Sequence, residues 1–497
     1  MRETFIKVSC ESERDNRSIW KDMATLAEAP QDSETTGGSA PAGAPRHWGE
    51  QRLTDADLAH IPGEAGWPVV GNTFTMLADP HAFAARMIAT HGKVYKNRAF
   101  GGWQIALIGA EANELLLFNK DKIFSSEQGW GPVLDQLFPR GLMLMDFEHH
   151  RIDRRALSIA FKPEPMRHYS GALNRGIARE VAGWAGPQTF YPAIKKLTLD
   201  LAADSFIGLP WGPEADKINA AFVDMVQASV APVRKPLPFT RMKKGVDGRA
   251  FLVEYFTRET LRRRVEGGGQ DMFSQFATAT REDGSLLPVD EVVDHMNFLM
   301  MAAHDTITSS ATSLIYHLAT NPEWQEKLRE EIFAVTGGPD GEGNPRPLDY
   351  DDLGKLELTE MAFKESLRMI PPVPSMPRRA LREFEYGGYR IPAGASVGIN
   401  IYWTHHSEEY WDNPFTFDPL RFTPDQVKAR HKYAWVPFGG GAHMCLGLHF
   451  AYMQVKILLA QLLQRYRIEA GAGYQPDWQD WPIPQPRDGL KVTFAPL

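Results

Sequence analysis

The chain has 497 residues, of which 43% are hydrophobic, and 62 acidic residues against 54 basic ones give a net charge of −8. Such a composition can build a large core, whereas the acidic balance argues against general nucleic-acid binding and against a membrane held by broad positive charge. The only cysteines are Cys10 and Cys445, so the chain has no disulfide framework and a reducing compartment, the cytoplasm, is expected.

The N-terminal residues are polar and end in a run of Ser, Thr, Gly, Ala and Pro. Such a segment cannot bury enough apolar surface to offset the entropy lost on ordering. We therefore predict a disordered tail over residues 1–45 and a single folded domain over residues 46–497. No run approaches the ~18 apolar residues that a membrane span requires, and the first residues lack the apolar segment of a signal peptide.

Helical patterns dominate the folded part, and the fold class is mainly α with small β-sheets. The expected helices cover residues 80–91, 147–161, 289–318, 322–335, 358–369 and 446–466. The expected strands are residues 103–108, a hairpin of residues 389–391 and 396–401 around a Pro-Ala-Gly turn, and an edge strand at residues 492–494.

The predicted helix 147–161 carries His150 and Arg154, which are four residues apart and share one face. The pair could hold an anion such as a carboxylate or a phosphate, or it could belong to a solvated face. The long predicted helix 289–318 is apolar on every side at its middle, which indicates a helix buried through the centre of the protein. Asp305 and Thr306 interrupt this apolar stretch; they could form a proton relay, or the Asp could pair with a distant Arg.

Glu365 and Arg368 are three residues apart on the predicted helix 358–369, so their side chains can meet, although most such pairs are solvent-exposed. Cys445 lies in a glycine-rich loop, Phe438 to Gly447, directly before a helical pattern. Loop amides and a helix N-terminus both favour a thiolate. A lone thiolate is one of the few protein ligands that push electron density onto a haem iron.

Taken in order, these segments resemble the cytochrome P450 family from about residue 61 to the last residue. The motifs that carry the resemblance are Pro62-Gly63, Pro68-Val69-Val70-Gly71-Asn72, His150-x-x-x-Arg154, Ala302-Ala303-His304-Asp305-Thr306, Glu365-x-x-Arg368, Phe417-Asp418-Pro419-Leu420-Arg421-Phe422 and Phe438-x-x-Gly441-x-His443-x-Cys445-x-Gly447. The resemblance implies a triangular, helix-rich body with haem b, iron protoporphyrin IX, between the long central helix and the helix that follows the Cys loop.

The resemblance also implies a role for each motif residue. Cys445 becomes the metal ligand, with Phe438 beside its sulfur and with Gly441 and Gly447 permitting the tight loop. The expected partners of the haem propionates are His150, Arg154, Arg378 and His443. Glu365, Arg368 and Arg421 become a structural ion-pair triad. Asp305 is expected to feed protons from solvent, and Thr306 to hydrogen-bond dioxygen.

By resemblance, the protein is a monooxygenase that inserts one oxygen atom of O2 into a lipophilic small molecule. Electrons are expected from a separate ferredoxin and its NAD(P)H reductase, and Arg151, Arg155 and Lys162 could offer the docking face. Residues 127–141, 230–239 and 481–484 are largely apolar and could line the substrate pocket, which favours a terpenoid, a steroid or a fatty acid; they could also be ordinary core. The alternatives are a peroxygenase driven by hydrogen peroxide and a haem-binding protein without turnover.

Overall fold

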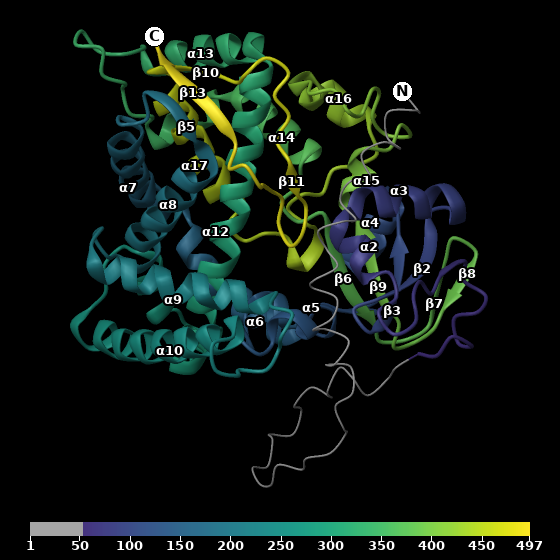
Figure 1. Cartoon of the computed structure of the whole chain (residues 1–497). Helices are drawn as coiled ribbons and strands as arrows, with labels where there is room; N and C mark the ends of the chain where they lie inside the picture. The colour runs from purple at the N-terminus through teal and green to yellow at the C-terminus, as the bar shows by residue number, and fades with distance from the viewer. Residues whose placement is uncertain (1–52) are drawn as a thin grey trace. The chain divides into compact units, whose positions relative to one another are not determined.

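The computed structural model describes residues 53–497 (Figure 1). These residues lie within one compact unit, Trp48–Leu497. The predicted disordered tail, residues 1–45, falls outside the described residues.

Helices form most of the described part. They are α2 (Thr73–Ala78), α3 (Pro80–His91), α4 (Ala110–Phe118), α5 (Glu127–Leu134), α6 (Phe147–Leu157), α7 (Pro163–Val181), α8 (Phe190–Ala202), α9 (Pro213–Ser229), α10 (Arg241–Glu266), α11 (Met272–Ala277), α12 (Val289–Thr320), α13 (Pro322–Thr336), α14 (Glu357–Met369), α15 (Ile401–His405), α16 (Pro424–Ala429) and α17 (Leu448–Leu463). Shorter helical turns are η3 (Leu142–Leu144), η4 (Ser158–Phe161), η5 (Ala203–Ile207), η6 (Tyr350–Lys355), η7 (Pro419–Phe422) and η8 (Gly441–His443). Each predicted helix is therefore present, and the class is confirmed as mainly helical.

The strands are short. They are β1 (Gly63–Glu64), β2 (Val94–Ala99), β3 (Gly102–Leu107), β4 (Phe124–Ser125), β5 (Gly186–Thr189), β6 (Ser375–Ala380), β7 (Phe384–Tyr386), β8 (Tyr389–Ile391), β9 (Ser396–Asn400), β10 (Tyr466–Glu469), β11 (Trp478–Gln479), β12 (Gln485–Pro486) and β13 (Lys491–Pro496). The largest sheet has the order β1-β2-β3-β9-β6-β4, and a three-stranded sheet has the order β10-β13-β5. In Figure 1 the larger sheet stands to one side of the helical region.

Two strand predictions were wrong. Strands β8 and β9 do not pair with each other: β8 pairs with β7, and β9 lies between β3 and β6. Gly387 and Gly388 lie between β7 and β8 with φ values of 57° and 81°, so this pair of glycines forms the hairpin turn in place of the expected Pro-Ala-Gly turn. The predicted edge strand at residues 492–494 is β13, which pairs on both sides and is central.

Helix α12 runs through the interior (Figure 1) and packs against α8, α10 and α14. Residues 292–298 and 307–315 of this helix are buried, and the two buried segments include polar as well as apolar side chains. It ends at Thr320, directly before Asn321 and the Pro322 that begins α13, since proline cannot continue a helix without losing a hydrogen bond.

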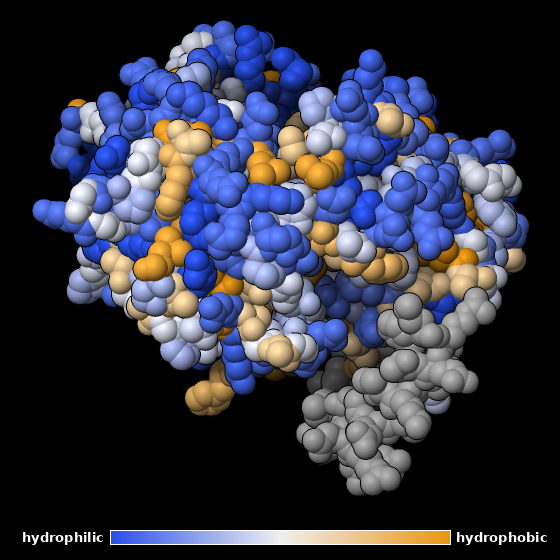
Figure 2. Space-filling view, turned by 90° about the horizontal axis from the view of Figure 1, so that it is seen from above, coloured by the Kyte–Doolittle hydropathy of each residue, from blue (hydrophilic) through white to orange (hydrophobic). Residues whose placement is uncertain are grey.

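No helix within residues 53–497 is both long enough and apolar enough to cross a bilayer. The face shown in Figure 2 is mostly hydrophilic, with small hydrophobic areas scattered among polar side chains.

Candidate active site

Cys445 lies between η8 and α17, in the loop of residues 438–447. The backbone amide of Cys445 donates a hydrogen bond of 2.9 Å to the carbonyl of Phe438, which closes the loop. Gly441 has φ +60°, and a Cβ at this position would lie 2.3 Å from the carbonyl oxygen of Leu117. The loop therefore requires glycine at residue 441, whereas at Gly447 a Cβ would meet only Phe161, at an ordinary 3.9 Å.

The Cys445 side chain is exposed, although surrounding protein atoms partly desolvate its sulfur. Burial raises the pKa of the Cys445 thiol, and the amide of Gly447 and the charge of Arg154 oppose that rise only in part. A loop amide, that of Gly447, therefore favours the thiolate as predicted, but desolvation outweighs it in the protein alone. A bound metal cation would supply the missing positive charge, since a coordinating thiol is deprotonated.

A cluster of basic groups lies beside this loop. The rings of His150 and His443 are 3.9 Å apart between centroids, and burial together with the charge of Arg154 lowers the pKa of His150 to about 4. Burial, then His150, Arg378 and Arg154, lower the pKa of His443 to about 2. Burial lowers the pKa of Arg378, which is 4% exposed, to about 10. Sequence reasoning anticipated these four residues, which the tertiary structure brings together from α6, β6 and η8.

This basic cluster fits an anionic group. Arg154 and Arg378 form no ion pair with any Asp or Glu among residues 53–497, and the buried Nε2 of His150 has no hydrogen-bond partner there. Buried cations and unpartnered ring nitrogens are costly unless an anion satisfies them. Two carboxylates, such as the propionates of a haem, would supply the missing acceptors next to the Cys445 sulfur.

The middle of α12 is less buried than the segments on either side of it: Ala302 is exposed, and Asp305 and Thr306 are half-buried. The Thr306 hydroxyl donates to the carbonyl of Ala302 at 2.7 Å. Asp305 lies 3.3 Å from Nζ of Lys195 and 3.0 Å from Nδ1 of His304, although the latter contact lacks hydrogen-bond alignment. Burial opposes ionisation of Asp305, but His304 and Lys195 outweigh it and lower its pKa to about 2.

Sequence reasoning missed Lys195. It expected that a structural partner of Asp305 would be a distant Arg, and the partner is a Lys on α8, 110 residues earlier. No local pattern marks this residue, because the contact depends on how α8 packs against α12.

The predicted structural triad does form. Arg368 donates to Glu365 through Nε at 2.7 Å and through Nη2 at 2.8 Å, and Nε of Arg421 lies 3.3 Å from the same carboxylate. Burial raises the pKa of the Glu365 carboxyl, and the two guanidinium groups oppose this rise.

The predicted pocket walls divide into two kinds. Leu137 and Phe138 are each 1% exposed and belong to the hydrophobic core, so for these two residues the alternative of ordinary core holds. Phe239, in contrast, is fully exposed, and Pro484 is buried against α12. The two arginines predicted to dock an acidic partner already form ion pairs within the protein: Arg151 pairs with Glu148 and Glu282, and Arg155 pairs with Glu282.

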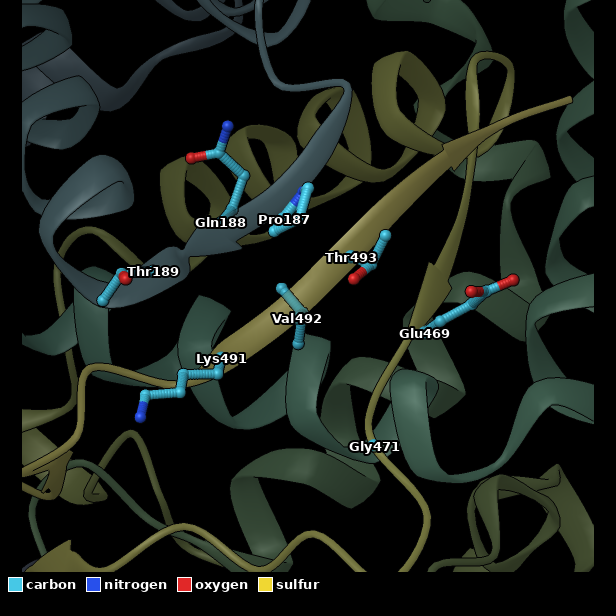
Figure 3. A pocket seen from close by; sticks show the side chains of 8 residues that line it. All are labelled: Pro187, Gln188, Thr189, Glu469, Gly471, Lys491, Val492 and Thr493. Atoms are coloured by element: carbon cyan, nitrogen blue, oxygen red, sulfur yellow. The ribbon is translucent and has the colours of Figure 1, made fainter.

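A surface hollow of about 370 Å³ lies elsewhere, over the sheet β10-β13-β5 (Figure 3). It is lined by Pro187, Gln188, Thr189, Glu469, Gly471, Lys491, Val492 and Thr493. None of these residues belongs to a motif or to α12, and most of them are solvent-exposed. We therefore place the candidate site at Cys445 and not at this hollow.

Comparison with known proteins matches residues 61–494 to the family model described as Cytochrome P450. The chain is 36% identical over 448 residues to "Putative cytochrome P450 136" of Mycobacterium tuberculosis, which covers 88% of this chain and 89% of that protein. It is 28% identical over 444 residues to "Abscisic acid 8'-hydroxylase 2" of Oryza sativa, covering 87% of this chain and 86% of that one. The solved structure "Retinoic acid bound cyanobacterial CYP120A1" superposes with a TM-score of 0.80 at 27% identity, covering 88% of this chain and 99% of that chain.

Proposed function

Because the chain belongs to the cytochrome P450 family, whose members are haem-thiolate monooxygenases, we propose that Cys445 is the thiolate ligand of the haem iron in this protein. The observation that carries this proposal is the position of the Cys445 thiol beside four basic side chains that have no ion pair with an Asp or Glu of residues 53–497. Haem, when bound, supplies the activation of O2 and the transfer of one oxygen atom, for which two electrons and two protons are required.

His150, Arg154, Arg378 and His443 would hold the two propionates. Arg378 is the most buried cation of this set and its Nη1 donates to the neighbouring carbonyl of Pro377 at 2.8 Å, which fixes the guanidinium. Burial, together with the charges of Arg154 and Arg378, lowers the pKa of both imidazoles, and a carboxylate at this point would offset the two positive charges. Phe438 packs between the aromatic rings of Trp435 and Tyr452. These contacts hold the segment of the loop that precedes Cys445.

Asp305 would move protons. Its carboxylate is ionised at neutral pH, since its pKa is lowered to about 2, and it contacts Lys195, whose side chain is 30% exposed. Lys195 therefore connects a largely buried carboxylate to solvent. Thr306 follows Asp305 directly and lies next to accessible surface, so its hydroxyl oxygen can accept a hydrogen bond while it donates to Ala302.

The enzyme acts on a lipophilic substrate. We propose that the substrate is an isoprenoid, such as a terpenoid or a steroid, or a fatty acid. The printed names of two similar proteins mention retinoic acid and abscisic acid, which are both isoprenoid acids. We further propose a ferredoxin with an NAD(P)H reductase as the electron source and the cytoplasm as the location.

The test is spectroscopic. The reduced protein with carbon monoxide is expected to show the strongly red-shifted haem band of thiolate ligation, and Cys445→Ser is expected to lose it. Retinoic acid, abscisic acid and lauric acid would then be screened by the change in iron spin state, and those that bind would be incubated with O2, ferredoxin and reductase. A histidine-type band in the parent protein would refute the ligand assignment, and turnover with hydrogen peroxide alone would indicate a peroxygenase.

A further inference from the structure

A hairpin near the C-terminus reaches α12. Strands β11 and β12 pair antiparallel, with Trp478 opposite Pro486 and Gln479 opposite Gln485. Their connection, residues 480–484, is called the hairpin tip below. In Figure 1 this part of the chain lies between α12 and the region of the larger sheet.

The hairpin contacts α12 at two points. The hydroxyl of Ser309 donates a hydrogen bond of 2.7 Å to the carbonyl oxygen of Pro484, and both residues are buried. Two turns further along the helix, the ring of Tyr316 meets the ring of Trp478 edge-on at 6.1 Å. Residues seven apart lie on one face of a helix, so the hairpin follows a single face of α12.

The other flank of the tip contacts different elements. Asp480 lies 3.4 Å from Nε2 of His81 on α3, and the ring of Trp481 stacks on Phe100, directly after β2, at 5.8 Å. The tip is thus held between α12 and the elements next to the larger sheet. The Ser309 hydrogen bond joins the tip itself to α12, whereas the Tyr316–Trp478 contact lies at the base of the hairpin.

The Ser309 hydroxyl is used differently from those around it. Thr308, Ser310 and Thr312 donate to carbonyls one turn earlier within α12, as hydroxyls in helices commonly do. Ser309 donates outside the helix, to the tip. It also lies one turn after Thr306, roughly 4.5 Å along the helix axis, so the contact is next to the proposed oxygen side of the site.

We propose that Ser309 is a positioning residue that sets how deeply the hairpin tip lies beside Thr306, and that it thereby limits the size of the ligand that fits over the haem. The proposal rests on the proposed function. Removal of the hydroxyl leaves the buried carbonyl of Pro484 without a donor, and a buried acceptor without a partner is satisfied only if the tip moves toward water. The tip then withdraws from α12 and the space beside Thr306 widens.

The experiment compares two azoles on the haem-loaded protein by the shift of the haem band. Imidazole is small, whereas 4-phenylimidazole needs room above the iron. In Ser309→Ala the Kd of 4-phenylimidazole is expected to fall about fivefold, the factor that one hydrogen bond typically contributes, while the Kd of imidazole stays the same. Ser309→Thr keeps a hydroxyl and is expected to restore the parent Kd.

Ser313→Ala is the matched control. Ser313 is buried on the same helix and also donates to a backbone carbonyl of another element, Ser366 on α14 at 3.3 Å, but it does not contact the hairpin. It is expected to leave both Kd values unchanged. If Ser309→Ala does not fold, Ser309→Cys, whose thiol is a weaker donor, is expected to give a smaller selective fall.

Three results would overturn the proposal: equal changes for both azoles, the same selective change in Ser313→Ala, or an unchanged 4-phenylimidazole Kd in a folded Ser309 variant. Failure of the proposed function is seen separately. In that case the parent protein gives no thiolate band with carbon monoxide, before any variant is compared.

Discussion

Substitution of Glu365 by Gln tests how much one buried ion pair contributes to this fold. Glu365 and Arg368 have no exposed side-chain surface, and the carboxylate also accepts the backbone N–H of Asp418 at 2.9 Å. A Gln has the same shape but carries no charge, and it turns an N–H toward the guanidinium. The charge of Arg368 would remain buried without its counter-ion.

Removal of one partner from a buried ion pair costs about 3–5 kcal/mol. Whole domains are stable by only about 5–15 kcal/mol, so the variant is expected to lose a large part of its free energy of unfolding. Arg368 also donates to the carbonyls of His405 and Pro414 at 2.8 and 2.7 Å, and displacement of its guanidinium would leave these carbonyls without a donor.

The matched control is Glu148→Gln. Glu148 and Arg151 are also three residues apart on a helix and have the same two-bond geometry, at 3.0 and 2.6 Å. Their side chains are 65% and 51% exposed, and exposed pairs contribute about 0.2–1 kcal/mol. Urea unfolding of both haem-loaded variants at one pH would measure the difference. Equal losses in the two variants, or a loss below about 1 kcal/mol for Glu365→Gln, would refute the reasoning.

Three further predictions concern the relay, acid stability and partner docking. Asp305→Asn cannot carry a proton as an acid, so turnover is expected to fall by about 100-fold or more while the reduced carbon monoxide spectrum stays unchanged; unchanged turnover would exclude Asp305 from proton delivery. Burial and the charge of Arg368 lower the pKa of His317 to about 3. Between about pH 6.5 and pH 3 the unfolded chain therefore binds a proton that the folded chain does not. As the pH is lowered through this range, the free energy of unfolding is expected to fall by up to about 1.4 kcal/mol per pH unit. His317→Phe, which keeps the ring stacked on Phe417, should therefore flatten the pH dependence of urea unfolding, and an equally steep curve would contradict this assignment. Reversal of Arg151 and Arg155 to Glu should slow electron transfer from ferredoxin and reduce its salt dependence in stopped-flow experiments, and if neither changes, the partner docks elsewhere.

The sequence by itself determined the helices, the Cys445 loop and the order of the motifs. These features depend on neighbouring residues: the period of apolar side chains gives α12, Pro322 ends it, and Gly441 permits the turn before Cys445. Cys445 and the pair His150–Arg154 could be singled out for the same reason, whereas Arg378 and His443 were named only through the resemblance to the family.

Tertiary structure alone decided which of these residues act together. Glu365–Arg368 and Glu148–Arg151 have the same spacing in sequence, yet one pair is buried and the other is exposed. Lys195 meets Asp305 across 110 residues, and β9 pairs with β3 and β6 instead of its neighbour β8. Such partners follow from how helices and strands pack at long range, which the local period of a sequence does not encode.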